Sequence, residues 1–123
     1  MCGIFALLNN KYSEKERLKK GFDKGKYRGP EYSKLIDLPS IQCSLGFHRL
    51  AINGVDDEQS NQPFCIDGIY LVCNGEIYNH KKILNILNIT PNSKSDCESI
   101  IHLYKKYGIE QTLQLLDGVF AFV

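Results

Sequence analysis

Short apolar runs closed by turn residues are the feature that most restricts the fold of this chain. The run Gly3–Leu8 is typical, because it is continuous and ends at Asn9–Asn10. A short apolar run with such a boundary indicates a buried strand. Similar strand-like segments lie at 41–52, as two stretches around Gly46, at 69–73 and at 119–123.

Apolar residues recur at helical spacing in much of the remaining chain. Leu18 and Phe22 lie one turn apart on an amphipathic stretch that ends before Gly25. Ser95 and Glu98 have the spacing of a capping box, which opens a helix. Further helices are predicted at 78–89, from Ser95 to Gly108 and at 109–116. Because no repeat or linker separates these segments, we predict one α+β domain over residues 1–123.

The charge balance argues against two classes of partner. The chain carries 15 basic and 14 acidic side chains, for a formal net charge of +1. This balance gives no electrostatic reason to expect nucleic acid or an anionic membrane as a partner. No apolar run is long enough to span a membrane, and no basic segment precedes the first apolar run. We therefore predict no membrane partner, no nucleic-acid partner and no signal peptide.

The cysteines indicate a reducing environment. They number five, which is odd, and none forms a CxxC pair. We therefore predict neither a metal site nor a disulfide framework, and we expect a cytoplasmic location. Cys43 and Cys73 have apolar neighbours and are predicted to be buried small hydrophobes.

Cys2 is the strongest candidate for chemistry. It follows the initiator Met1, so removal of Met1 would leave a thiol and a free α-amine on one residue. An α-amine titrates at about pH 8, and its neutral form can accept the proton of the thiol. Nucleophile and base then belong to the same residue. The alternative is that Cys2 is simply a small second residue without a chemical role.

Asn74-Gly75 could supply an oxyanion hole. The Asn side-chain NH₂ and the backbone N–H of the next residue can point at one oxygen, and Gly permits close approach and unusual backbone angles. Taken alone, however, the pair favours the alternative, an ordinary tight turn.

Three charged residues could bind the ends of an amino acid. Arg49 interrupts an apolar segment, and its guanidinium fits a carboxylate, although an internal salt bridge or a surface position explains it equally. Asp96 and Glu76 could bind an α-ammonium group. Their alternatives are stabilisation of a helix N-terminus for Asp96 and a solvated turn for Glu76. His48 has no visible partner, and we predict a structural role for it.

Seven motifs follow one another along nearly the whole chain: Met1–Phe5, Arg28–Glu31, Gly46–Ile52, Gln62–Pro63, Asn74–Asn79, Ser95–Glu98 and Leu116–Phe122. Together and in this order they resemble the class II (N-terminal nucleophile) glutamine amidotransferases. The residues of two of them, His48–Ile52 and Asn74–Asn79, are most similar to the N-terminal glutaminase domain of the glutamine-hydrolysing asparagine synthetases. One departure is Tyr27-Arg28-Gly29-Pro30-Glu31, where the family has His-Arg-Gly-Pro-Asp. The contacts of this loop therefore do not follow from the resemblance.

The resemblance implies a reaction and its catalytic residues. Cys2 would attack the side-chain amide of L-glutamine, and Asn74 with Gly75 would form the oxyanion hole. The products would be glutamate and ammonia, the latter supplied for the synthesis of asparagine from aspartate. The alternative function is a non-catalytic truncated remnant or a glutamine-binding module.

The resemblance also implies how glutamine is bound. Arg49 would bind its α-carboxylate, and Glu76 with Asp96 would take its α-amino end. The backbone around Leu50 to Ile52 would line the pocket.

The implied fold is an Ntn-hydrolase-like αββα sandwich of two antiparallel sheets, in which Cys2 opens a central strand. Because the family's domain continues past Phe122, we expect 1–123 to be a glutaminase domain truncated at its C-terminus. The synthetase domain is absent and would be a partner domain or subunit that accepts the ammonia. The glutaminase half-reaction would need no cofactor, whereas ATP and Mg would belong to the synthetase domain.

Overall fold

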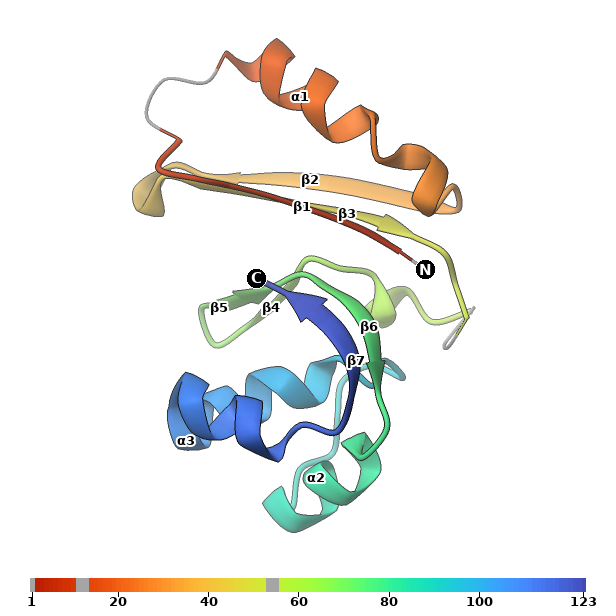
Figure 1. Cartoon of the computed structure of the whole chain (residues 1–123), viewed down its shortest axis with the longest axis vertical. Coiled ribbons are helices and arrows are strands. Elements are labelled where there is room, and N and C mark those ends of the chain that lie inside the picture. Colours follow the sequence, from red (N-terminus) through yellow and green to blue (C-terminus); the bar gives the residue numbers. More distant parts are fainter. Residues whose placement is uncertain (1, 11–13, 53–55) are drawn as a thin grey trace.

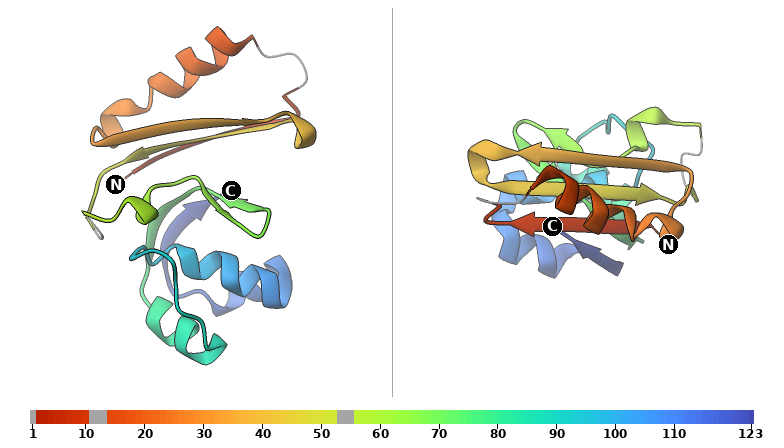
Figure 2. Two further views of the ribbon diagram at one scale, coloured as in Figure 1. Left: turned by 180° about the vertical axis from the view of Figure 1, so that it is seen from behind. Right: turned by 90° about the horizontal axis from the view of Figure 1, so that it is seen from above.

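The structure is a computed structural model that describes residues 2–10, 14–52 and 56–123. Figure 1 shows four layers, with α1 outermost, then β1 to β3, then β4 to β7, and α2 with α3 on the far side. Figure 2 shows the same order from behind and, from above, α1 lying across the first sheet. Antiparallel strands with helices outside them confirm the α+β class. The elements are β1 (Gly3–Leu8), α1 (Lys15–Asp23), η1 (Lys26–Arg28), β2 (Tyr32–Leu38), η2 (Pro39–Ile41), β3 (Cys43–Arg49), η3 (Glu58–Ser60), β4 (Phe64–Ile66), β5 (Ile69–Leu71), β6 (Cys73–Ile77), α2 (His80–Leu87), α3 (Glu98–Leu115) and β7 (Gly118–Phe122).

β3 is the middle strand of the first sheet. It pairs antiparallel with both β1 and β2 and is buried along its whole length. The prediction of two stretches around Gly46 was wrong, because β3 runs through this residue without interruption. The ring of Phe22 from α1 lies where a side chain at position 46 would be, since an added Cβ would approach it to 2.5 Å. Glycine therefore makes room for α1 and does not break the strand.

β1, which follows Cys2 directly, lies at the outside of this sheet. The strand order is β1-β3-β2, so the expectation that Cys2 opens a central strand was wrong for the sheet as described. β2 was not predicted, because its sequence Tyr-Ser-Lys-Leu-Ile-Asp-Leu has neither a long apolar run nor a regular alternation of polar and apolar residues. Its pairing with β3, from Tyr32 opposite Arg49 to Leu38 opposite Cys43, holds it in extended conformation.

The second layer contains two antiparallel pairs, β4 with β5 and β6 with β7. Asn74 and Gly75 lie inside β6, opposite Ala121 and Phe120 of β7, so the tight turn favoured by the pair alone was wrong. Gly75 does not have a positive φ. It is required by close approach, since an added Cβ would lie 2.4 Å from the backbone oxygen of Val119.

The helices agree well with their apolar spacing. Leu18 and Phe22 are the buried residues of α1. In α3 the backbone of Gly108 is non-helical, with φ 75° and ψ 178°, so the predicted end of one helix and start of the next is confirmed as a sharp kink. None of the helices in the described ranges is both long enough and apolar enough to cross a bilayer.

Two apolar clusters fill the space between the layers. One joins β4 to β7 with α2 and α3, and the other joins β3 to Val72, Cys2 and Ile4 between the two strand layers. Cys43 and Cys73 are buried in these clusters, as predicted. Cys2 therefore lies where the two strand layers meet.

Candidate functional site

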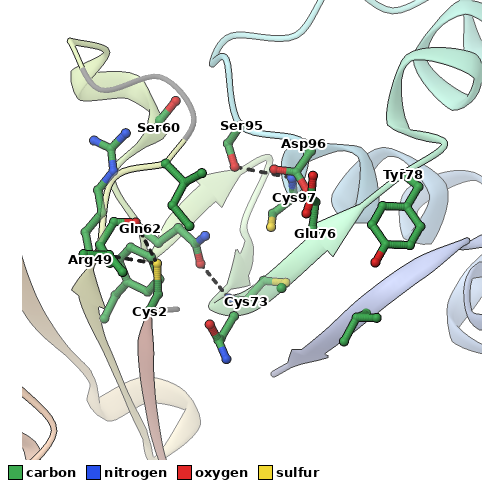
Figure 3. Close-up of a pocket in the computed structure, with 16 residues that line it drawn as sticks. Cys2, Arg49, Ser60, Gln62, Cys73, Glu76, Tyr78, Ser95, Asp96 and Cys97 are labelled. Carbon is green, nitrogen blue, oxygen red and sulfur yellow. Dashed lines mark hydrogen bonds between the residues drawn. The ribbon is translucent and has the colours of Figure 1, made fainter. Parts of the chain in front are cut away.

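A cavity of about 210 Å³ opens between the two strand layers. It is smaller than the roughly 300–1,000 Å³ typical of sites for drug-sized ligands, so its size suits a small metabolite. Figure 3 shows side chains from several separate segments surrounding it. The structure brings together in its wall all eight candidate residues of the sequence analysis: Cys2, Arg49, Leu50, Ile52, Asn74, Gly75, Glu76 and Asp96.

The thiol of Cys2 lies against the main chain of Leu50. Its Sγ is 3.4 Å from the backbone nitrogen of Leu50, which donates to it, and 3.5 Å from the backbone oxygen, to which it donates. Cys2 is only half-buried, so its sulfur is held in place while the residue keeps access to solvent. Met1, whose removal is needed for the α-amine predicted at Cys2, lies outside the described residues.

The loop that departs from the family pattern also contacts this corner of the site. Arg28 donates from Nε to the backbone oxygen of Cys2 at 3.1 Å. The Glu31 carboxylate accepts a hydrogen bond from the backbone nitrogen of Ala51. The altered residue Glu31 therefore supports the segment after β3, and Arg28 holds the chain at Cys2.

Arg49 is buried, with 7% of its surface exposed, so the surface alternative was wrong. Its Nη1 donates to the side-chain oxygen of Asn61 at 2.7 Å and to the backbone oxygen of Asp57 at 3.3 Å. Both acceptors are neutral oxygens, and these two bonds hold the guanidinium in the cavity wall. A guanidinium is a planar donor whose shape matches that of a carboxylate.

Asp96 is buried and Glu76 is exposed, although both line the cavity. Oδ2 of Asp96 accepts a hydrogen bond of 2.6 Å from the backbone nitrogen of Ile77, so the carboxylate joins the segment before α3 to β6. The two acidic residues make this end of the cavity negative. It lies across the cavity from Cys2 in Figure 3.

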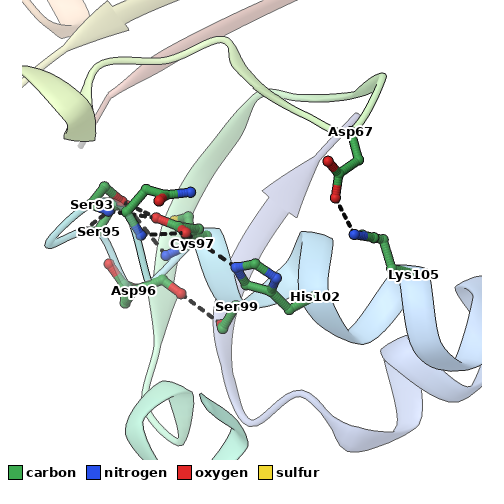
Figure 4. Close-up of polar contacts among 10 residues, drawn as sticks. Asp67, Ser93, Ser95, Asp96, Cys97, Ser99, His102 and Lys105 are labelled. Atoms are coloured by element: carbon green, nitrogen blue, oxygen red, sulfur yellow. Dashed lines mark hydrogen bonds and ion pairs between the residues drawn. The ribbon is translucent and has the colours of Figure 1, made fainter. Parts of the chain in front are cut away.

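The carboxylate of Glu98 holds the segment that carries Asp96. Glu98 is 1% exposed and accepts hydrogen bonds from the backbone nitrogens of Asn92 and Ser93, at 2.8 Å each, and from Ser93 Oγ at 2.6 Å. His102 lies one turn further along α3, with its Nε2 3.1 Å from Glu98 (Figure 4). The predicted capping box was wrong. The Glu98 carboxylate binds Asn92 and Ser93 and not the backbone N–H of Ser95. The Oγ of Ser95 accepts from the backbone nitrogen of Cys97.

Two further cysteines line the cavity but differ from Cys2. Cys73 and Cys97 are 1% and 3% exposed. A hydrogen bond with the Cys73 thiol and burial together raise the pKa of Cys97 far above its usual range, so this thiol stays protonated. Of the three, Cys2 is the most accessible. No three His, Cys, Asp or Glu side chains in the described ranges are grouped to hold a metal ion.

His48 has the structural role that was predicted for it. The ring is 1% exposed and stacks on Phe22 at 3.9 Å between ring centroids. Its Nε2 lies 2.9 Å from the backbone oxygen of Phe22 and its Nδ1 2.7 Å from Ser33 Oγ. Both ring nitrogens are thus used to join α1 and β2 to β3, and His48 faces away from the cavity.

Sequence reasoning missed Gln62 as a cavity residue. It is 4% exposed, and its Oε1 accepts a hydrogen bond of 2.6 Å from the backbone nitrogen of Cys73. The only signal was its place in the Gln62–Pro63 motif, which carries no chemistry by itself. Other cavity residues that were not predicted are Phe47, Ser60, Cys73, Tyr78, Ser95, Cys97 and Val119.

Comparison with known proteins gives the family. A family model described as "Glutamine amidotransferase domain" matches residues 1–123. Glutamine-hydrolyzing asparagine synthetases from Homo sapiens, Bos taurus and Gallus gallus are 41%, 40% and 37% identical to the chain over 127 residues. Each alignment covers 100% of this chain and 22% of the relative, so the chain spans about a fifth of the length of these relatives. The match over the whole sequence confirms the resemblance carried by the seven motifs, and the chain belongs to the glutamine amidotransferase domain family.

Proposed function

We propose that this chain hydrolyses the side-chain amide of L-glutamine to glutamate and ammonia, with Cys2 as the nucleophile. The observation that carries the proposal is the cavity itself. It gathers an accessible thiol, a buried guanidinium, two carboxylates and the Asn74–Gly75 segment within a space suited to an amino acid.

In the proposed reaction, loss of Met1 frees the α-amine of Cys2, which accepts the proton of the thiol. The thiolate attacks the amide carbon of glutamine, and the tetrahedral oxyanion accepts hydrogen bonds from the Asn74 side chain and the Gly75 N–H. The C–N bond breaks as the amine returns its proton, so that ammonia leaves and a γ-glutamyl thioester remains. Water then attacks the thioester, releases glutamate and restores the thiol.

Arg49, Glu76 and Asp96 orient the substrate in this proposal. The guanidinium of Arg49 binds the α-carboxylate, and Asp96 and Glu76 bind the α-ammonium group, with the main chain of Leu50 to Ile52 along the wall. One oxygen of Asp96 accepts from Ile77, and a carboxylate has a second oxygen for the ligand. The opposite charges of the two groups give glutamine one orientation, with its amide toward Cys2.

We propose an Ntn-hydrolase-like αββα sandwich as the fold and an incomplete glutaminase domain as the unit. The layer order in Figure 1 supports the fold. The relatives are glutamine-hydrolyzing asparagine synthetases and are much longer than this chain, which supports a synthetase domain or subunit that takes the ammonia to make asparagine from aspartate. ATP and Mg belong to that part, whereas the chemistry proposed for Cys2 requires no cofactor. A free nucleophilic thiol is suited to the reducing cytoplasm.

Labelling with a glutamine-like diazo-ketone tests the proposal. The reagent alkylates a thiol only where an assembled site holds it against the nucleophile, so intact-mass analysis should find one adduct, on Cys2, in protein that has lost Met1. The Cys2→Ala variant should bind glutamine without turnover or labelling, and Cys65→Ala, which removes an exposed thiol, should behave as wild type.

Each alternative result has a definite meaning. Glutamine binding without turnover or labelling in the wild-type chain would identify a glutamine-binding module instead of an enzyme. Turnover near the wild-type rate in Cys2→Ala would remove Cys2 as the nucleophile.

A further inference from the structure

β6 uses alternate residues to pair with β7. Val72, just before the strand, exchanges two backbone hydrogen bonds of 3.0 Å with Val123, and Tyr78, just after it, donates to the oxygen of Asp117 at 2.8 Å. The register between the two strands is constant from one end of β6 to the other. In an antiparallel pair the residues that face the partner strand alternate with residues whose N–H and C=O groups point the other way. The N–H groups of residues 73, 75 and 77 therefore point away from β7.

Two of these three outward N–H groups are bound by buried side chains. Cys73 N donates to Gln62 Oε1, and Ile77 N donates to Asp96 Oδ2, each at 2.6 Å. The acceptor residues come from separate segments and are 4% and 6% exposed. The Gly75 N–H lies between them, on an exposed residue, and has no acceptor within the part of the chain that the structure describes.

We propose that Gln62 is a positioning residue. Gln62 and Asp96 bind the outward N–H groups of Cys73 and Ile77, which flank Gly75 along β6. The Gly75 N–H is then the one outward donor of β6 that is presented to the cavity. This inference rests on the proposed function, because Gly75 is a proposed oxyanion donor. A strand edge with three open donors would bind water or another strand. With the outer two bound, the central donor is held in place for an oxygen of the substrate.

The chemistry of the two acceptors fits their positions. Figure 3 shows the Gln62 amide between Cys2 and Cys73, whereas Asp96 lies on the far side of the cavity. A carboxylate beside the nucleophile would oppose the thiolate and the oxyanion by like charge. Gln62 accepts the Cys73 hydrogen bond without adding a negative charge there. The carboxylate of Asp96 is placed where the substrate ammonium is proposed to bind.

Amide hydrogen exchange, followed by NMR on the 123-residue chain, tests the arrangement without requiring activity. In the wild type the Cys73 and Ile77 amides should exchange at least about tenfold more slowly than Gly75. Gln62→Met removes the acceptor and should raise exchange at Cys73 about tenfold while leaving Ile77 unchanged. Gln62→Glu keeps an acceptor oxygen and should leave Cys73 protected.

A matched control is Gln59→Met, the same substitution on an exposed residue of η3, which should change none of these rates. Equal protection of Gly75 and its two neighbours in the wild type would overturn the inference, and this measurement needs no variant to fold. Unchanged protection of Cys73 in a folded Gln62→Met protein would overturn it as well.

Kinetics test the consequence for catalysis. Gln62→Met should lower kcat for glutamine hydrolysis by roughly 10–100-fold, because a displaced donor no longer meets the transition state, with KM changed less than about twofold. An unchanged kcat, or an effect on KM alone, would refute the positioning role. A wild-type chain without turnover would refute the proposed function, and the exchange result would then decide the role of Gln62 by itself.

Discussion

Replacing Glu98 should destabilise the fold strongly. Its carboxylate accepts from two buried donors of Ser93, and Glu98→Ala leaves both without an acceptor. Each unsatisfied buried donor costs about 1–3 kcal/mol, while relief from burying the charge offsets part of the loss. The exposed amide of Asn92 can bind water and adds little. We therefore expect the free energy of unfolding to fall by about 3 kcal/mol.

Urea unfolding at pH 7 measures this change. With a slope of about 1–3 kcal/mol per molar urea, the midpoint should fall by roughly 1–3 M. Glu98→Gln keeps one acceptor oxygen and should lose only about 1–2 kcal/mol. Glu110→Ala, an exposed glutamate on the same helix, is the control and should stay within about 0.5 kcal/mol of wild type. A loss below about 1 kcal/mol in Glu98→Ala would refute the reasoning from buried donors.

The pH dependence of the same variants provides an independent check. Burial by itself raises the pKa of Glu98, but hydrogen bonds from Ser93, Asn92 and His102 outweigh it and leave the pKa below its usual value. The unfolded chain therefore binds this proton first as the pH falls, so acid removes the stabilisation below an unfolded-state pKa of about 4.3. The stability difference between wild type and Glu98→Gln should shrink over that range, and a difference that grows with acid would contradict the lowered pKa.

Two further substitutions test the proposed reaction. Asn74→Ala should lower kcat by about 10²–10³ if the side chain is an oxyanion donor, measured as glutamate release, and an effect confined to KM would contradict that role. Arg49→Ala should weaken glutamine binding by about 1.5–3 kcal/mol, measured by calorimetry in a Cys2→Ala background that prevents turnover. Unchanged affinity would assign Arg49 a structural role, to which its bonds to Asn61 and Asp57 contribute.

Local sequence patterns predicted most of the elements whose conformation depends on residues close in sequence. Leu18 and Phe22 lie one turn apart and form the buried face of α1, as predicted. Gly108 interrupts α3 locally, also as predicted. Predictions failed where a partner distant in sequence decides. Asn74-Gly75 favours a turn locally, yet pairing with β7 makes it part of a strand. The residues of β2 carry no clear strand pattern and form a strand by pairing with β3.

The candidate site shows the same division. The residue types identified Cys2, Asn74 and Asp96 as able to do chemistry, and all three line the cavity. The sequence could not indicate that Gln62 reaches β6, because that contact depends on how the chain returns to the cavity. Likewise, Glu98 has capping-box spacing, but its burial against Ser93 depends on the path of the preceding loop.

The contact between Cys2 and Leu50 has a consequence for protein engineering. Among the described residues, the sulfur hydrogen-bonds to the main-chain nitrogen and oxygen of residue 50, and every amino acid except proline supplies both groups. The side chain at position 50 can therefore be varied to reshape the cavity wall for other amides while both hydrogen bonds to the sulfur are kept. Proline at this position would remove the N–H that donates to the sulfur.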